Sequence, residues 1–257
     1  MFALYSVLLA TTVLLNIFCI PFLNTVNTDT PNPTAKITEY NKLAKNSAIK
    51  TPTHRQLTKA GVLIVHNGNE GNFSVLIESA RKNFLNTPGY MVTYFILSNR
   101  FQVTPQDPDI IELGQNVHSS SFQTHFHSWL ENSAAFAEMD YLFVVQTNMH
   151  FEKIVGTEVL GDLVAVLHPN FHEWRRELFP YETRPKSCAF VSDSLGLFYV
   201  HGAFYGGKKD IMLNMFKSLD DCIEKDRHRN IIAIRNDESY LNNYLVHHPP
   251  SILLNSV

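Results

Sequence analysis

The chain has 257 residues, of which 45% are apolar and 18% charged, and its net charge is -3. This length and apolar content suffice for one substantial hydrophobic core, most simply a single domain with appendages. The slightly acidic balance lacks the basic footprint of nucleic-acid binding, so no nucleic acid is expected as a partner. Cys19, Cys188 and Cys222 have no metal-ligand spacing, and at most one pair of them can join within the folded part.

The amino-terminal part indicates attachment to a membrane. Residues 2–23 carry no charged side chain and match the roughly 20 apolar residues that cross a bilayer, which predicts a signal-anchor helix within residues 1–23. A cleaved signal peptide is the alternative, since an apolar core of about 7–15 residues suffices for one. Residues 24–60 are rich in Thr, Asn, Pro and Lys, which predicts a flexible stem. One sequon, Asn72-Phe73-Ser74, suits a lumenal domain.

The folded domain is predicted to occupy residues 61–257 and to begin with a βαβ unit. Residues 61–65 form a short apolar run, and residues 73–84 place apolar side chains at helical spacing. A second apolar strand is predicted at residues 90–97. The intervening loop, residues 66–71, holds two glycines but lacks the glycine spacing of a dinucleotide fingerprint.

The central strand is predicted at residues 141–145, an unbroken run of apolar and aromatic side chains typical of a strand buried on both faces. The polar residues Gln146, Thr147 and Asn148 follow it directly. In open α/β sheets, ligands bind beyond the carboxyl ends of the strands, so these three residues are candidates for binding a nucleotide or a metal.

The segment before the central strand predicts a helix within residues 122–137. His118, His125 and His127 suggest a metal site, but two helical residues two positions apart point about 200° away from each other. Surface or packing histidines are therefore the favoured interpretation.

Four further elements are expected after the central strand. Residues 155–169 predict a short helix. Residues 198–207 mix aromatic and small residues, a composition that fits either a sugar-binding surface or an aromatic strand ending in a glycine turn. Residues 208–226 predict an amphipathic helix. A last helix begins near Asn236, where Asp237 and Glu238 are either an ordinary acidic first turn or a functional pair.

Taken together, six blocks of the chain resemble, in order and with matching gaps, those of the family 6 glycosyltransferases. The likeness covers about residues 61–254. The blocks are residues 140–151, 155–160, 167–169, 179–187, 198–207 and 237–244.

The resemblance implies an α/β fold of the GT-A type, a Rossmann-like mixed sheet flanked by helices in one domain behind the anchor and stem. It also implies a single-pass type II protein of the Golgi membrane with a lumenal catalytic domain. The implied reaction is retaining transfer of galactose or N-acetylgalactosamine from UDP-galactose or UDP-N-acetylgalactosamine to a galactose-containing glycan, forming an α-1,3 linkage.

The resemblance also assigns roles to residues of this chain. Glu238 falls on the catalytic carboxylate, and His168 and Arg235 fall on acceptor-binding positions. Ala203, where a glycine is an alternative, is expected to narrow the donor pocket and to favour galactose by about 1–3 kcal/mol. The donor-binding positions are Val65, His66, Gln146, Asn148, His201, Gly202, Ala203 and Asp237.

The chain also departs from the family pattern. Gln146 and Asn148 occupy the Asp-x-Asp positions that bind manganese, and neutral amides are poor ligands for a hard cation. The basic carboxyl-terminal tail and an arginine before the central strand are missing, and Arg235 replaces an aromatic acceptor platform. The cations proposed to neutralise the diphosphate instead are Lys208, Lys209, Arg184 and Arg235.

Two functions therefore stay open. One is an active, metal-independent, membrane-bound hexosyltransferase, which the presence of Glu238 favours. The other is a non-catalytic, membrane-anchored descendant that binds a sugar or a partner without turnover, which the neutral residues at 146–148 favour.

Overall fold

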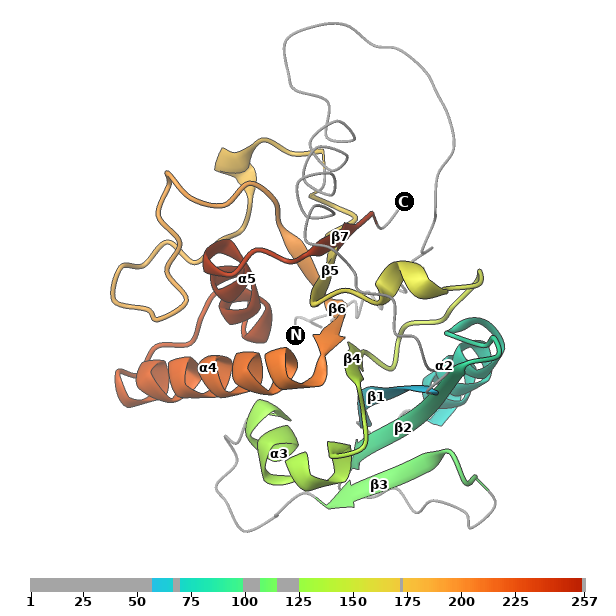
Figure 1. Cartoon of the computed structure of the whole chain (residues 1–257). Coiled ribbons are helices and arrows are strands. Elements are labelled where there is room, and N and C mark those ends of the chain that lie inside the picture. The colour runs from blue at the N-terminus through green and yellow to red at the C-terminus, as the bar shows by residue number, and fades with distance from the viewer. Residues whose placement is uncertain (1–56, 67–69, 99–106, 115–124, 172, 256–257) are drawn as a thin grey trace, which may run out of the picture.

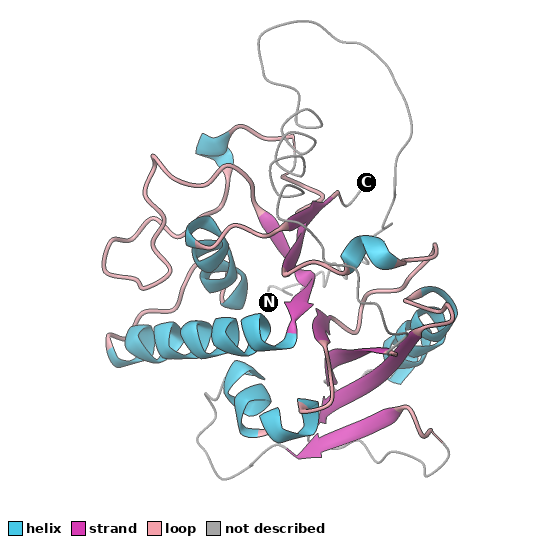
Figure 2. Cartoon of the chain, viewed as in Figure 1, coloured by secondary structure: helices cyan, strands magenta, loops and turns pink. Residues whose placement is uncertain are grey.

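The computed structural model describes residues 57–66, 70–98, 107–114, 125–171 and 173–255. They form one mixed α/β domain, a seven-stranded sheet flanked by helices (Figures 1 and 2). No helix in these ranges is long and apolar enough to cross a bilayer. The predicted anchor, nearly all of the predicted stem and His118 lie outside the described residues.

The sheet has the strand order β3-β2-β1-β4-β6-β5-β7. The first four strands in that order are parallel, β6 runs antiparallel to both of its neighbours, and β7 is parallel to β5. The mixed sheet confirms this part of the predicted fold class. The strands are β1 (Thr58–His66), β2 (Tyr90–Ser98), β3 (Ile110–Gly114), β4 (Tyr141–Val145), β5 (Leu163–Leu167), β6 (Val200–Lys208) and β7 (Ile252–Leu254).

The predicted βαβ unit is present as β1, α2 (Glu70–Asn83) and β2. Strand β1 starts three residues earlier than predicted, because Thr58 pairs with Tyr90 and the Lys59 N–H donates to Asp140 Oδ2 at 2.8 Å. The last residues assigned to the stem therefore belong to the sheet.

The predicted helix at residues 155–169 is wrong. Only the 3-10 turn η2 (Thr157–Val159) is helical, and Leu163–Leu167 form strand β5, buried at every position. A short apolar run buried on both faces has no periodicity that separates a strand from a buried helix segment. Pairing with β6 and β7 decides the outcome here.

Helices cover both faces of the sheet (Figure 1). Helices α3 (His125–Glu131), α4 (Lys209–His228) and α5 (Asp237–His247) contribute to one buried apolar cluster, while α2 contributes to another. These elements confirm the helices expected within 122–137, at 208–226 and near 236, with η1 (Ser133–Phe136) completing the first.

A segment between β5 and β6 is mostly loop, with the 3-10 turn η3 (Arg176–Leu178) as the one helical element among its described residues. It is linked covalently and by hydrogen bonds to the helices. The disulfide Cys188–Cys222 joins this segment to α4. Beside it, the fully buried carboxylate of Asp226 accepts from Ser187 Oγ at 2.5 Å, Cys188 N–H at 2.7 Å and Tyr240 Oη at 3.1 Å.

Candidate active site

A cavity of about 770 Å³ lies beyond the carboxyl ends of β1 and β4. Its wall includes Val65, residues 146–148, Gly202 and the turn at residues 234–238. The sheet order explains why these residues lie together, because β1 and β4 are parallel neighbours and β6 brings Gly202 alongside β4. The cavity therefore gathers residues that are more than 170 positions apart in the chain.

Glu238 is held by two hydrogen bonds at the wall of this cavity. Tyr199 Oη donates to Glu238 Oε1 at 3.1 Å, and the Gly202 N–H donates to Glu238 Oε2 at 3.1 Å. A Cβ at Gly202 would lie 3.7 Å from Oε2, an ordinary van der Waals contact, so it is the Gly202 N–H rather than the lack of a side chain that holds the carboxylate. The carboxylate is thus fixed in direction rather than free to rotate into solvent.

Helix α5, which carries Glu238, is fixed to β6 by Asn242. Its Oδ1 accepts from the Val200 N–H at 2.9 Å, and its Nδ2 donates to the Val200 carbonyl at 3.0 Å. The side chain of Asn242 therefore mimics a neighbouring strand, one helical turn beyond Glu238. Asn236, just before the helix, has φ +46° and ψ -129°, a costly backbone conformation of the kind that concentrates at functional sites.

Burial raises the pKa of Glu238 above its ordinary value. The Gly202 N–H, the Tyr199 hydroxyl and the positive charge of Arg235 act in the opposite direction, each favouring the ionised form. The net result is a carboxylate that is partly desolvated yet has two donors to stabilise its charge. Such a group is suited to nucleophilic attack or to stabilising a developing cation.

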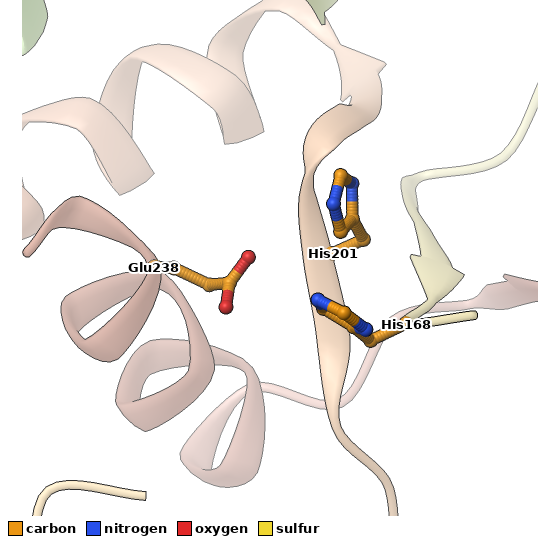
Figure 3. Close-up of side chains that lie close together, drawn as sticks. All are labelled: His168, His201 and Glu238. Carbon is orange, nitrogen blue, oxygen red and sulfur yellow. The ribbon is translucent and has the colours of Figure 1, made fainter. Parts of the chain in front are cut away.

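Two histidines face Glu238 across a small gap (Figure 3). His168 follows β5, His201 lies in β6, and ligand atoms of the three side chains lie within 4.8 Å of one another. Burial lowers the pKa of His168 to about 3 and that of His201 to about 4. Both imidazoles are therefore neutral at pH 7.

The backbone fixes the tautomer of both rings. The Asn170 N–H donates to His168 Nδ1 at 3.2 Å, and the Ala203 N–H donates to His201 Nδ1 at 3.1 Å. A neutral ring whose Nδ1 accepts must carry its proton on Nε2. The pair therefore presents two N–H donors, which suit hydroxyl or anionic oxygen atoms and do not suit metal ligation.

The residues at the expected metal position do not fit a divalent cation. Gln146 and Asn148 are exposed beyond β4, and they offer only neutral amides. The two carboxylates on the cavity wall, Asp237 and Glu238, are engaged by His125, Tyr199 and Gly202. Hard divalent cations prefer carboxylate oxygens, so these donors make a weak manganese site.

His125 faces Asp237 at the cavity wall. It lines the cavity from the first turn of α3, and its Nδ1 lies 3.2 Å from Asp237 Oδ2. Burial lowers the pKa of His125, against the attraction of Asp237. His127 points elsewhere and pairs with Asp220 at 3.0 Å, so these two described histidines do not share a metal.

Three predicted donor-binding residues, His66, His201 and Ala203, do not line the cavity, and His201 instead faces Glu238 beside His168. His66 is 6% exposed, with its ring 5.0 Å from that of Phe73 in α2. Ala203 is fully buried in the apolar cluster on the α2 side of the sheet. The Ala203 methyl therefore does not narrow the cavity, and the expected preference for galactose loses its structural basis.

Three of the four cations proposed to neutralise a diphosphate are engaged elsewhere. Lys208 pairs with Asp162 at 2.7 Å, Lys209 Nζ donates to the Ala137 carbonyl, and Arg184 pairs with Glu182 at 2.6 Å. Arg235 lines the cavity.

The sequon also lies at the cavity. Asn72 belongs to helix α2 and lines the cavity wall, although its side chain is exposed. A glycan at this position would occupy the space that a ligand needs.

Comparison with known proteins identifies the family. The model of glycosyltransferase family 6 matches residues 71–256. The chain is 35% identical over 192 residues to the globoside alpha-1,3-N-acetylgalactosaminyltransferase 1 of Homo sapiens, covering 69% of this chain and 54% of that protein. It is 32% identical over 191 residues to the histo-blood group ABO system transferase 1 of Rattus norvegicus, covering 70% and 54%.

A third relative is the glycosyltransferase 6 domain-containing protein 1 of Rattus norvegicus, 28% identical over 214 residues, covering 78% of this chain and 67% of that protein. An α/β sheet with a carboxylate-bearing cavity at its strand ends and the matched family model define the class of protein. This chain belongs to glycosyltransferase family 6. It spans about half the length, 54%, of the first two of these relatives.

Three residues of the site were not singled out from the sequence. Tyr199 and Asn242 contact Glu238 or its helix through bonds that depend on how α5 packs on β6. His125 was considered as part of a His-x-His pair but not as a partner of Asp237.

Proposed function

We propose that this protein is a retaining hexosyltransferase that moves galactose or N-acetylgalactosamine from a UDP-sugar to a galactose-containing glycan, forming an α-1,3 linkage. The observation that carries the proposal is the carboxylate of Glu238, held by Tyr199 and Gly202 at the wall of the cavity that also contains residues 146–148. Membership of glycosyltransferase family 6 supports the reaction class, transfer of a sugar from a donor to an acceptor.

In this proposal Glu238 faces the anomeric carbon of the donor sugar. It acts either as a nucleophile or as the group that stabilises an oxocarbenium-like transition state. Asp237, positioned by His125, binds donor-sugar hydroxyls. The Nε2–H groups of His168 and His201 donate to sugar oxygens near the point of transfer.

We propose that the donor binds without manganese, because residues 146–148 supply no carboxylate. Calorimetric titration of the full-length chain with UDP, with and without manganese, tests this. The expected result is weak binding that manganese changes by less than about threefold. A manganese-dependent gain of tenfold or more, about 1.4 kcal/mol, would contradict metal independence.

A Golgi-lumenal location on a single-pass type II anchor is part of the same proposal. The disulfide Cys188–Cys222 supports it, since disulfides form and persist in oxidising compartments.

The second candidate is a non-catalytic family member that binds a sugar or a partner. The neutral side chains of Gln146 and Asn148 favour it, because losing a metal without replacement would slow transfer by orders of magnitude. A radiolabelled donor screen against galactose-terminated acceptors separates the two. Incorporation of label supports the transferase, and UDP binding with no incorporation from any donor supports the binding protein.

A further inference from the structure

Arg235 differs from the other cations considered for this site. Its backbone is fixed by the first turn of α5, with its N–H donating to Ser239 Oγ at 3.0 Å. Its guanidinium lies over the ring of Phe171, 5.7 Å from the ring centroid. Within the described part of the chain, no carboxylate forms an ion pair with it, whereas Arg184 is paired with Glu182.

The surroundings of Arg235 are rich in hydrogen-bond donors. The Phe171 ring is 4.3 Å from that of His168, whose Nε2 carries a proton for the reason given above. Burial lowers the pKa of His168, and the neighbouring His201 and the positive charge of Arg235 lower it further. The Glu238 carboxylate, whose ionised form the charge of Arg235 favours, already accepts two hydrogen bonds. An anionic group on a ligand would meet the donors of Arg235 and His168 here.

An aromatic surface borders the same place. The Trp174 ring lies 4.8 Å from that of Phe171 at an angle of 69°, and Trp174 is 48% exposed. A half-exposed indole offers an apolar face to a sugar ring and keeps its N–H available to solvent. Trp174 thus supplies an exposed ring for sugar packing, and Arg235, over the buried Phe171 ring, supplies a guanidinium with which no carboxylate of the described residues forms an ion pair.

We propose that the acceptor is an anionic glycan, a galactose-containing oligosaccharide bearing a sulfate or carboxylate that pairs with Arg235. This inference rests on the proposed function and names its acceptor class. A guanidinium recognises such groups with two parallel hydrogen bonds, a geometry that lysine cannot supply. The alternative partner, the diphosphate of the donor, is expected beside residues 146–148, whereas Arg235 lies against Phe171 on the His168 side.

The test titrates the full-length chain in detergent with N-acetyllactosamine and with its two forms sulfated at C6 of either sugar. All three keep the galactose O3 free. We expect at least one sulfated form to bind about tenfold or more tightly than the neutral sugar at low salt. Arg235→Gln should remove the difference and Arg235→Lys should retain part of it.

Arg175→Gln is the matched control, since it removes the same charge from an arginine that is 77% exposed and pairs with Glu177. It should leave the preference for sulfate intact. UDP titration of Arg235→Gln verifies that the variant is folded. It also shows whether Arg235 binds the acceptor, in which case UDP affinity is kept, or the diphosphate of the donor, in which case UDP affinity is lost. Equal binding of sulfated and neutral sugars by the unmodified chain overturns the inference, and so does an Arg235→Gln variant that loses UDP affinity but keeps sulfate selectivity.

Failure of the proposed function gives a different pattern. A chain that prefers sulfated glycan through Arg235 but binds no UDP and transfers no sugar supports the anion site and removes the transferase. A chain that transfers sugar equally well to neutral and sulfated acceptors, with Arg235→Gln unchanged, keeps the transferase and overturns the anion site.

Discussion

The hydroxyl of Tyr199 is the side-chain group that bonds directly to Glu238. Because it donates to the ionised carboxylate, it holds the pKa of Glu238 below the value that burial alone would give. Nucleophilic or electrostatic use of Glu238 needs the ionised form, so activity falls as the pH drops through that pKa.

Tyr199→Phe should therefore move the acid limb of the pH profile of kcat/KM to higher pH. A hydrogen bond to a charged group is worth about 1.5–3 kcal/mol, which corresponds to a shift of about one pH unit or more. Tyr181→Phe is the control, because the Tyr181 hydroxyl donates to the Phe198 carbonyl instead. An unchanged acid limb in Tyr199→Phe would remove this residue from the positioning of the carboxylate.

Among the elements, the segment between β5 and β6 depends most on a covalent link. The disulfide Cys188–Cys222 closes a loop with a sequence separation of 34 residues. Chain-entropy arguments give such a loop about 3–4 kcal/mol of stabilisation. The same segment supplies Phe171 and Trp174, so its attachment to α4 also bears on the candidate acceptor site.

Cys222→Ser should lower the free energy of unfolding by about 3–4 kcal/mol, measured by denaturant titration without reductant. Cys19→Ser, which removes a thiol outside this disulfide, serves as the control and should unfold like the unmodified chain. A denaturation midpoint of Cys222→Ser within error of that of the unmodified chain would show that the disulfide adds no stability and that packing alone holds the segment in place.

The elements also show how far sequence patterns reach. Local periodicity and turn residues predicted β1, β2, β4 and the amphipathic helix α4. Strand β5 was mistaken for a helix, and β3 and β7 were not predicted, because short strands are specified by their partners rather than by their own residues. Glu238 was assigned from a motif, while its contacts with Tyr199 and Gly202 join positions 36 or more residues apart.

At the scale of the whole molecule, buried neutral histidines make stability depend on pH. Burial lowers the pKa values of His125, His168 and His201. In contrast, the hydrogen bond between His127 and Asp220 raises the pKa of His127. Above about pH 6.5, the first three are neutral whether the chain is folded or unfolded. Below it, they bind protons mainly in the unfolded chain, so stability is lost as the pH falls.

We expect the unfolding midpoint to drop between pH 6.5 and 5. Each of the three histidines contributes up to about 1.4 kcal/mol per pH unit, and His127 partly offsets them because its contribution is present below pH 6.5. Thermal unfolding at pH 7, 6 and 5 measures the trend, and His201→Gln should make it shallower. A midpoint that is constant or rises on acidification would contradict neutral burial of these rings.

In the proposed reaction, the Glu238 carboxylate performs the transfer step at the wall of the cavity that contains residues 146–148. Glu238→Gln keeps the shape and removes the charge, so sugar transfer should fall at least a thousandfold, about 4 kcal/mol, while UDP affinity stays within about threefold. Glu224→Gln, which affects a surface pair with Arg227, should change neither. Transfer by Glu238→Gln at the rate of the unmodified chain would exclude Glu238 as the catalytic carboxylate.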